Sequence, residues 1–307
     1  MAGNTQIRTS NETAAAPSSQ SGLFLLLKSM RPKQWTKNLV IFAGIIFSRN
    51  IFVDAYLLKT YYAFIAFCAL SGSIYIINDL MDIEKDRAHP EKRNRPLASG
   101  QLSAPLAIVF VILTTAASLF GAFWLDRGFG IVALTYFLLV LSYNFKLKNV
   151  VIIDVLAIAL GFILRAVAGA VVIAVDISPW LLVCTFLLAL FLALNKRRHE
   201  LVLLSGNAQL HRKILGEYEP AMLDQMLSVV TSSTVMAYSL YTFTSGHSTY
   251  LMGTIPFVVY GIFRYQYLVF RKDIGGSPES ALIKDPPMLI NVLLWVLSCA
   301  LILYFLG

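Results

Sequence analysis

Residues 78–100, "NDLMDIEKDRAHPEKRNRPLASG", place a dense group of charges directly after an apolar run. If the helix of that run continues, Asp79, Asp82 and Asp86 stand at i, i+3 and i+7 and share one helix face, with Asn78 an i, i+4 neighbour of Asp82. Carboxylates stacked in this way repel one another and are costly to remove from water without a partner. The stretch therefore predicts a bound cation at the end of an apolar helix.

Oxygen ligands of this kind suit Mg²⁺, which keeps part of its water shell and takes the rest from substrate phosphates. The helical rise from Asp79 to Asp86 is about 10 Å, enough for a diphosphate with its metal ions. We expect Asn78, Asp79, Asp82 and Asp86 to hold the metal. The bases that follow are expected to neutralise phosphate oxygens; they are Lys92, Arg93 and Arg95. The alternative is a solvated loop of mixed charge that pairs with itself and acts as a topology signal.

The composition places the chain in the membrane class. Of its 307 residues 57% are hydrophobic and 14% charged, whereas a soluble domain is about a quarter charged. A span needs about 20 mostly apolar residues. This criterion predicts an all-α integral membrane protein of about nine transmembrane helices, at 38–54, 57–77, 103–125, 128–143, 151–175, 178–194, 224–243, 250–270 and 287–306. Residues 1–21 are polar and read as a disordered leader, which leaves 22–307 as one transmembrane domain.

The positive charge lies in one set of loops. The net charge is +8, yet the other set of loops holds only Arg49, Lys59 and Arg127. The positive-inside rule then predicts a plasma-membrane protein with its N-terminus and the charged loops in the cytoplasm and its C-terminus outside. The bases alternate with carboxylates instead of forming a stripe, which argues against nucleic acid as a partner. Apolar outer faces permit a symmetric homo-oligomer, such as a trimer.

The pattern N-D-x-x-D-x-x-x-D (Asn78–Asp86), followed by R-P-L-x-x-G (Arg95–Gly100), resembles the first aspartate-rich motif of the UbiA prenyltransferase superfamily. The resemblance implies a helical bundle around a central cavity that opens to the cytoplasmic face and binds a Mg²⁺-diphosphate substrate. Most members carry a second motif, D-x-x-x-D, after the sixth span. Here that loop opens "NKRRHEL" (195–201), with Glu200 its only nearby acid, and Asp154 at the start of the fifth span is another candidate.

Four further stretches resemble the decaprenyl-phosphate phosphoribosyltransferase branch of that superfamily: "RPKQWTKN" (31–38), "YNFKLK" (143–148), "GFILRAVAGA" (161–170) and "NKRRHEL". The branch transfers 5-phosphoribose from 5-phosphoribosyl-1-pyrophosphate (PRPP) to decaprenyl phosphate and releases pyrophosphate. Its product, decaprenylphosphoryl-5-phosphoribose, leads to the arabinose donor for arabinogalactan and lipoarabinomannan in the cell wall of mycobacteria and relatives. One metal cluster with one basic cluster suits a substrate that has a diphosphate and a separate phosphate.

This chemistry assigns expected roles to the remaining candidates. Metal held by the aspartates would stabilise the leaving pyrophosphate, and positioning would do most of the rest, with inversion at ribose C1. Candidates for the ribose 5-phosphate are Lys196, Arg197 and Arg198, although Arg198 and His199 are expected rather to face water. Candidates for the lipid phosphate are Lys33, Lys37, Lys146 and Arg165. Further substrate-binding candidates are Tyr143, Asp154 and Glu200, with Tyr218 a weaker one.

Lys33, Lys37 and Lys146 have an alternative to substrate binding, which is to anchor helix ends among anionic lipid headgroups. Arg165 differs from them. It lies in the middle of a span, where a charge costs about 2.5–3.5 kcal/mol on insertion scales, so we expect it to face the cavity and count it with the catalytic residues. Asp154, on the same helix, is too far for direct pairing. The small residues around Arg165 predict close helix packing; they are Gly161, Ala166, Gly169 and Ala170.

Two other functions remain open. One is a prenyltransferase that attaches a polyprenyl chain to an aromatic acceptor, as in quinone or haem O synthesis, against which the missing second aspartate motif argues. The other is a transporter or lipid flippase. Transporters carry charges near the membrane midplane, whereas here only Arg165 is deep and the remaining charge gathers at one face.

Overall fold

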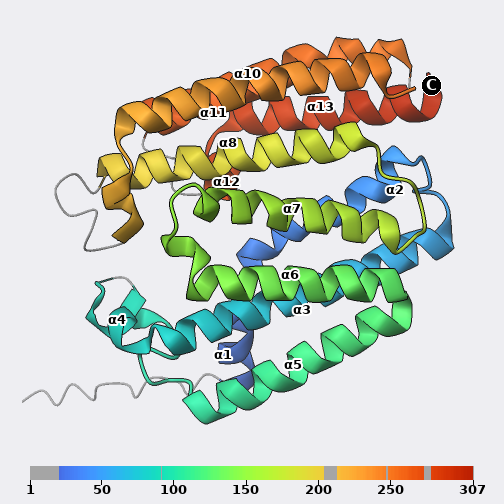
Figure 1. Cartoon of the computed structure of the whole chain (residues 1–307). Coiled ribbons are helices and arrows are strands. Elements are labelled where there is room, and N and C mark those ends of the chain that lie inside the picture. Colours follow the sequence, from blue (N-terminus) through green and yellow to red (C-terminus); the bar gives the residue numbers. More distant parts are fainter. Residues whose placement is uncertain (1–20, 91, 204–212, 247, 273–277, 307) are drawn as a thin grey trace, which may run out of the picture.

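The computed structural model describes residues 21–90, 92–203, 213–246, 248–272 and 278–306, and every regular element in these ranges is helical (Figure 1). The eight long helices are α3 (Asp54–Met81), α5 (Ala104–Leu125), α6 (Arg127–Phe145), α7 (Ile153–Val171), α8 (Pro179–Leu203), α10 (Pro220–Thr244), α11 (Ile255–Arg271) and α13 (Pro286–Phe305). The short ones are α1 (Gly22–Ser29), η1 (Pro32–Phe42), α2 (Ala43–Phe47), α4 (Ile83–Ala88), η2 (Lys92–Asn94), η3 (Leu147–Asn149), η4 (Lys213–Glu217), η5 (Thr249–Thr254) and α12 (Pro278–Lys284).

Six of the long helices are apolar and long enough to cross a membrane, counted over the described ranges: α3, α5, α6, α7, α8 and α13. The other two fall short for different reasons. Helix α11 has only 17 residues, and α10 carries many Ser and Thr, in "SVVTSSTVMAYSLYTFT". The all-helical expectation is confirmed, and these long helices begin and end within a few residues of the expected spans, apart from the eighth span and the C-terminal end of α8.

The first expected span, 38–54, is wrong as a continuous α-helix. The chain instead forms a 3₁₀ helix, η1, followed by the five-residue α2, which ends at Phe47. Part of the reason is the polar Asn38, which is fully buried and bonded to neighbouring helices. The eighth span is also divided, because η5 precedes α11 and Pro256 stands in the first turn of that helix.

Helix α7 makes the closest contacts in the bundle. A Cβ added to Gly169 would lie 1.8 Å from the carbonyl oxygen of Ile41 in η1, and one added to Gly44 in α2 would lie 2.9 Å from Cα of Ala170. The backbones of η1, α2 and α7 can approach this closely only because these positions are glycine. The expected packing role of Gly169 and Ala170 is thereby confirmed.

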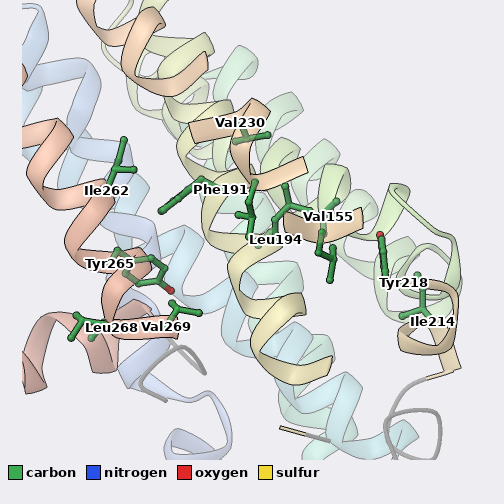
Figure 2. Close-up of a cluster of buried hydrophobic side chains, with 14 residues drawn as sticks. Val155, Phe191, Leu194, Ile214, Tyr218, Val230, Ile262, Tyr265, Leu268 and Val269 are labelled. Carbon is green, nitrogen blue, oxygen red and sulfur yellow. The ribbon is translucent and has the colours of Figure 1, made fainter. Parts of the chain in front are cut away.

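Two apolar clusters meet at α7. In the first, shown in Figure 2, Val155 of α7 packs with side chains of α8, η4, α10 and α11, among them Phe191 and Tyr265. In the second, Ala168 of α7 packs with side chains of η1, α2, α3 and α6. The two polar residues of α7, Asp154 and Arg165, therefore stand where the two halves of the bundle join.

We predict that Gly169→Ala destabilises the protein by about 3 kcal/mol, because its methyl group would meet backbone that cannot rotate away. Gly121→Ala in α5 is the matched control, since a Cβ there has no atom outside its own helix within 4 Å and alanine favours helix. Thermal unfolding of both variants in detergent measures the difference. Equal unfolding temperatures would contradict the close η1–α7 packing.

Candidate active site at the end of helix α3

The three aspartates keep their helical spacing beyond the end of α3. Helix α3 ends at Met81 and α4 begins at Ile83, yet the N–H of Asp82 donates to Asn78 O (3.1 Å) and that of Asp86 to Asp82 O (2.8 Å). Asp79 and Asp86 are 3% and 4% exposed, while Asp82 and Asn78 are half-buried. Two carboxylates are thus removed from solvent at the end of an apolar helix, as the sequence predicts.

Arg95 lies between the two buried carboxylates. Its Nη1 donates to Asp86 Oδ2 at 2.5 Å and to Asp79 Oδ1 at 3.0 Å. Among the described residues no three acidic, histidine or cysteine side chains converge on one point: Arg95 bridges Asp79 and Asp86, and the Asp82 carboxylate contacts Lys85. As a donor set, three carboxylates and one amide oxygen still fit a divalent ion that prefers oxygen.

Arg31 is the member of this site that the sequence interpretation missed. Its Nη2 donates to the same Oδ1 of Asp79, and its guanidinium lies 4.9 Å from the ring centroid of Tyr75, one turn before Asp79. The backbone of Arg31 is left-handed, with φ 53°, a conformation that costs a non-glycine residue of order 1 kcal/mol and is common at functional sites. Its place directly before Pro32, in the quoted "RPKQWTKN", was the available signal.

A second polar cluster joins the C-terminal ends of α6 and α8 to the N-terminal end of α7. Arg197, 1% exposed, donates from Nε to Asp154 Oδ2 (2.7 Å), from Nη1 to Glu200 Oε2 (2.8 Å) and from Nη2 to the Tyr143 hydroxyl (3.1 Å). Four of the candidates chosen from the sequence therefore contact one another. Removing Arg197 would take from Asp154 its buried charge partner, and removing Asp154 would leave Arg197 with the more exposed Glu200; breaking such a buried pair is costly.

Tyr218, between η4 and α10, completes this second cluster. Its hydroxyl donates to Asp154 Oδ1 (2.7 Å) and accepts the N–H of Ile152 (2.8 Å). Burial, with donation to Asp154, raises the pKa of Tyr218 far above its ordinary value, so the hydroxyl stays protonated as a donor. Ile152 has φ 68°, an outlier for a β-branched residue, and the Tyr218 bond holds it there.

Arg165 is deep in the bundle and surrounded by neutral groups. It donates from Nε to Asn38 Oδ1 (2.8 Å), from Nη1 to Gly161 O (2.9 Å) and from Nη2 to the Tyr136 hydroxyl (2.7 Å). Asn38 in turn donates to Ser71 Oγ and Cys68 Sγ on α3. Within the described ranges Arg165 forms no ion pair, and Asp154 is bound elsewhere, as its distance along the helix implies.

The remaining candidates lie nearer the surface. Lys33, Lys92 and Lys146 are exposed, and Lys37 and Lys196 are half-buried; Lys196 Nζ is 4.0 Å from Glu200. The expectation that Arg198 and His199 face water is wrong. His199 is 6% exposed, and Arg198 binds Asp224 of α10 through two nitrogens and lies over the Phe270 ring of α11, so it ties three helices together.

Comparisons with known proteins agree on one family. Residues 38–293 match the model of the UbiA prenyltransferase family. The chain is 32% identical to decaprenyl-phosphate phosphoribosyltransferase of Corynebacterium glutamicum over 91% of this chain and 86% of that protein. It is also 32% identical to the protein of the same name from Mycolicibacterium smegmatis, over 91% and 92% of the two chains. A UbiA homologue from Archaeoglobus fulgidus bound to GPP and Mg²⁺ has the same fold, with a TM-score of 0.70, 20% identity and coverage of 91% and 99%.

We predict that Asp154→Asn costs about 3 kcal/mol of stability, because the Arg197 guanidinium would lose a fully buried charge partner. Asp224→Asn is the control: its partner is also an arginine, but the Asp224 side chain is 43% exposed, and such pairs contribute below about 1 kcal/mol. Chemical or thermal unfolding of the two variants in the same detergent compares them. A larger loss for Asp224→Asn would show that the buried pair is not the stabilising one.

Proposed function

The chain belongs to the UbiA prenyltransferase family, and on this premise we propose that it catalyses Mg²⁺-dependent transfer of 5-phosphoribose from PRPP to a polyprenyl phosphate such as decaprenyl phosphate. The products are pyrophosphate and decaprenylphosphoryl-5-phosphoribose. Two relatives that are named for this activity, from Corynebacterium glutamicum and Mycolicibacterium smegmatis, align with the chain over 86% and 92% of their own length. The product would serve as precursor of the arabinose donor for arabinogalactan and lipoarabinomannan.

One observation carries the proposal: the end of α8, where the resemblance places a second aspartate motif, holds the bases Lys196 and Arg197 with Glu200 as the acid beside them. Arg197 is buried there with Asp154 and Glu200, and Lys196 lies beside them. A site with a single acidic cluster has one place for a metal-bound diphosphate. The Lys196 side chain is 43% exposed and suits a second, separate phosphate, which PRPP has and a prenyl diphosphate lacks.

The chain's own residues then divide the work of the reaction. Mg²⁺, when held by Asn78, Asp79, Asp82 and Asp86, would stabilise the leaving pyrophosphate; a UbiA homologue of the same fold was solved with this ion. Arg95 lies next to these ligands and is placed to contact the diphosphate. Lys196 orients the ribose through its 5-phosphate, held near Arg197 and Tyr143. The lipid phosphate is already an anion and needs no strong base, so positioning and electrostatics suffice.

The lipid phosphate requires cations on the other side of the ribose. Lys33, Lys37 and Lys146 lie near the membrane boundary and are the proposed ligands. Arg165 supplies positive charge that no acid neutralises in the described structure, from a place fixed by Asn38 and Tyr136. Its proposed role is to attract anionic substrate into the bundle, because a buried charge without an ion pair favours an incoming anion.

The proposed arrangement in the membrane follows from the same features. Residues 22–307 form one catalytic domain of nine membrane crossings, with the broken η1–α2 segment as the first crossing and α10 and α11 among the rest. The central cavity opens to the cytoplasm at the end of α3, with the N-terminus inside and the C-terminus outside the plasma membrane. Apolar outer faces such as that of α5 permit a homo-oligomer, for which we propose a trimer.

We predict that purified protein with Mg²⁺ moves label from PRPP into lipid when decaprenyl phosphate is present, and that a chelator stops the transfer. Asp82→Asn is expected to lower kcat at least about 100-fold, because one metal-holding carboxylate is lost. Folding should be unchanged, since Asp82 is half-buried and its side chain forms only one weak ion pair within the described residues, with Lys85 at 3.5 Å. The parallel mixture contains a labelled prenyl diphosphate and 4-hydroxybenzoate. If labelled product formed only in that mixture, as prenylated 4-hydroxybenzoate, the protein would be an aromatic prenyltransferase and the proposal would be wrong.

Lys196→Met should raise KM for PRPP by about tenfold or more while kcat changes less, because a charged contact to the 5-phosphate contributes about 1.5–3 kcal/mol. Lys148→Met is the matched control, a half-buried lysine outside the proposed site. Initial-rate kinetics at saturating decaprenyl phosphate gives both constants. An unchanged KM would remove Lys196 from the substrate site.

A further inference from the structure

We propose that Arg31 and Arg95 are exchangeable counter-ions of the aspartate cluster: they neutralise Asp79 and Asp86 in the metal-free protein and move to the substrate's diphosphate when a divalent cation takes the carboxylates. The inference deepens the proposed function and rests on it, because it assumes a metal-bound diphosphate at this site. It assigns a role to Arg31 and predicts that metal and diphosphate bind as one unit.

The first step concerns the position of Arg95. One nitrogen, Nη1, contacts carboxylates seven residues apart, Asp79 at 3.0 Å and Asp86 at 2.5 Å. A cation that bridged the same two carboxylates would need the place of this nitrogen. Arg95 and a divalent ion therefore exclude each other, and metal binding requires the guanidinium to leave.

The second step concerns charge. The three carboxylates Asp79, Asp82 and Asp86 together carry −3, and the bases that contact them, Arg31, Arg95 and Lys85, together carry +3, so the six groups sum to zero. A divalent ion added to this neutral group leaves an excess of +2 in a largely buried place, which is unfavourable where the dielectric constant is low. A diphosphate brought with the metal cancels the excess. The metal alone is therefore expected to bind weakly.

The third step concerns which groups can move. The side chains of Asp79 and Asp86 are 3% and 5% exposed, whereas those of Arg31 and Arg95 are 30% and 26% exposed. The carboxylates are held in the helical register, and the arginines approach them from the open side. Arg87 Nε also holds the loop after Arg95 through Ala98 O (3.2 Å). The arginine side chains can swing outward while the backbone around them stays in place.

Arg31 provides an independent sign that this arrangement is held under strain. Its φ of 53° is unfavourable for arginine, and its contacts to Asp79 and to the Tyr75 ring are what hold the side chain in that place. If Asp79 held a divalent cation, Arg31 would lose this hydrogen bond and keep its contact with the Tyr75 ring. Its guanidinium is then free to donate two hydrogen bonds to a phosphate beside the metal.

The test measures binding of Mn²⁺ alone to the full-length protein in detergent, from the electron paramagnetic resonance signal of the free ion. Arg95→Gln and Arg31→Gln are expected to bind Mn²⁺ about tenfold more tightly than the wild type, because a competing charged contact is gone. Arg93→Gln is the matched control: it removes an exposed arginine of the same loop, whose side chain contacts neither Asp79 nor Asp86, and its Mn²⁺ affinity should stay within about twofold of wild type. Size-exclusion profiles confirm that each variant is folded, and Arg31→Gln keeps the test intact if Arg95→Gln does not fold.

A second measurement uses radiolabelled PRPP at saturating Mn²⁺, to which Arg95→Gln should bind about tenfold more weakly. Weaker PRPP binding with unchanged Mn²⁺ affinity would overturn the exchange and leave Arg95 as an ordinary phosphate ligand. If neither the Mn²⁺ affinity nor the PRPP affinity changed, the arginine contacts would have only a structural role and the proposal would be wrong. Absence of any Mn²⁺ binding to the wild type, with or without PRPP, would instead contradict the proposed function, so the two failures are distinguishable.

Discussion

Charge placed inside an apolar helical bundle must be neutralised or hydrogen-bonded where it stands, and the described structure is organised around three answers to that constraint. At the end of α3, two buried carboxylates are neutralised by two arginines of other segments. Between α7 and α8, Asp154 and Arg197 form a buried ion pair completed by neutral hydroxyls. Around Arg165 only neutral acceptors are present, so its charge is hydrogen-bonded without being cancelled.

These three clusters differ in how readily they can accept a ligand. The buried Asp154–Arg197 pair is expected to hold α6, α7 and α8 at fixed distances, and the partly exposed Lys196 beside it is the group proposed to contact a substrate phosphate. The aspartate cluster is balanced by arginines that are partly exposed, so its balance can be exchanged. Among the residues that the structure describes, Arg165 has no charged partner to lose. The ability to bind charged substrates directly therefore increases from the second cluster to the first and the third, although all three contain an arginine.

Much of the helical content and the burial of Asp79 and Asp86 at the end of α3 were predictable from the sequence, because both follow from local spacing, whereas the joining of Asp82 to them as a metal site stays a prediction. Asp79, Asp82 and Asp86 share a helix face by arithmetic, and long apolar runs define most of the long helices. The broken first span was not predictable, since it depends on how closely Ile41 approaches Gly169 on a distant helix. Arg31 was missed for a similar reason: its contact with Asp79 joins residues 48 apart, and neighbouring basic residues carry the same local signal.

The 3₁₀ form of η1 sets the distance between Arg31 and Asn38, and both residues contact α3. Arg31 contacts Asp79, and seven residues later Asn38 contacts Ser71 and Cys68, which lie eight and eleven residues before Asp79 on α3. Seven residues of a 3₁₀ helix advance about 14 Å, between the roughly 12 and 16 Å that separate those partners along α3, whereas an α-helix would advance only about 10 Å. The length of the 3₁₀ helix thus matches the spacing of its partners along α3. It explains how one short segment can contact both Asp79 at the end of α3 and the deeply buried Arg165. Any relative that shortened or rewound it would have to give up one of the two contacts.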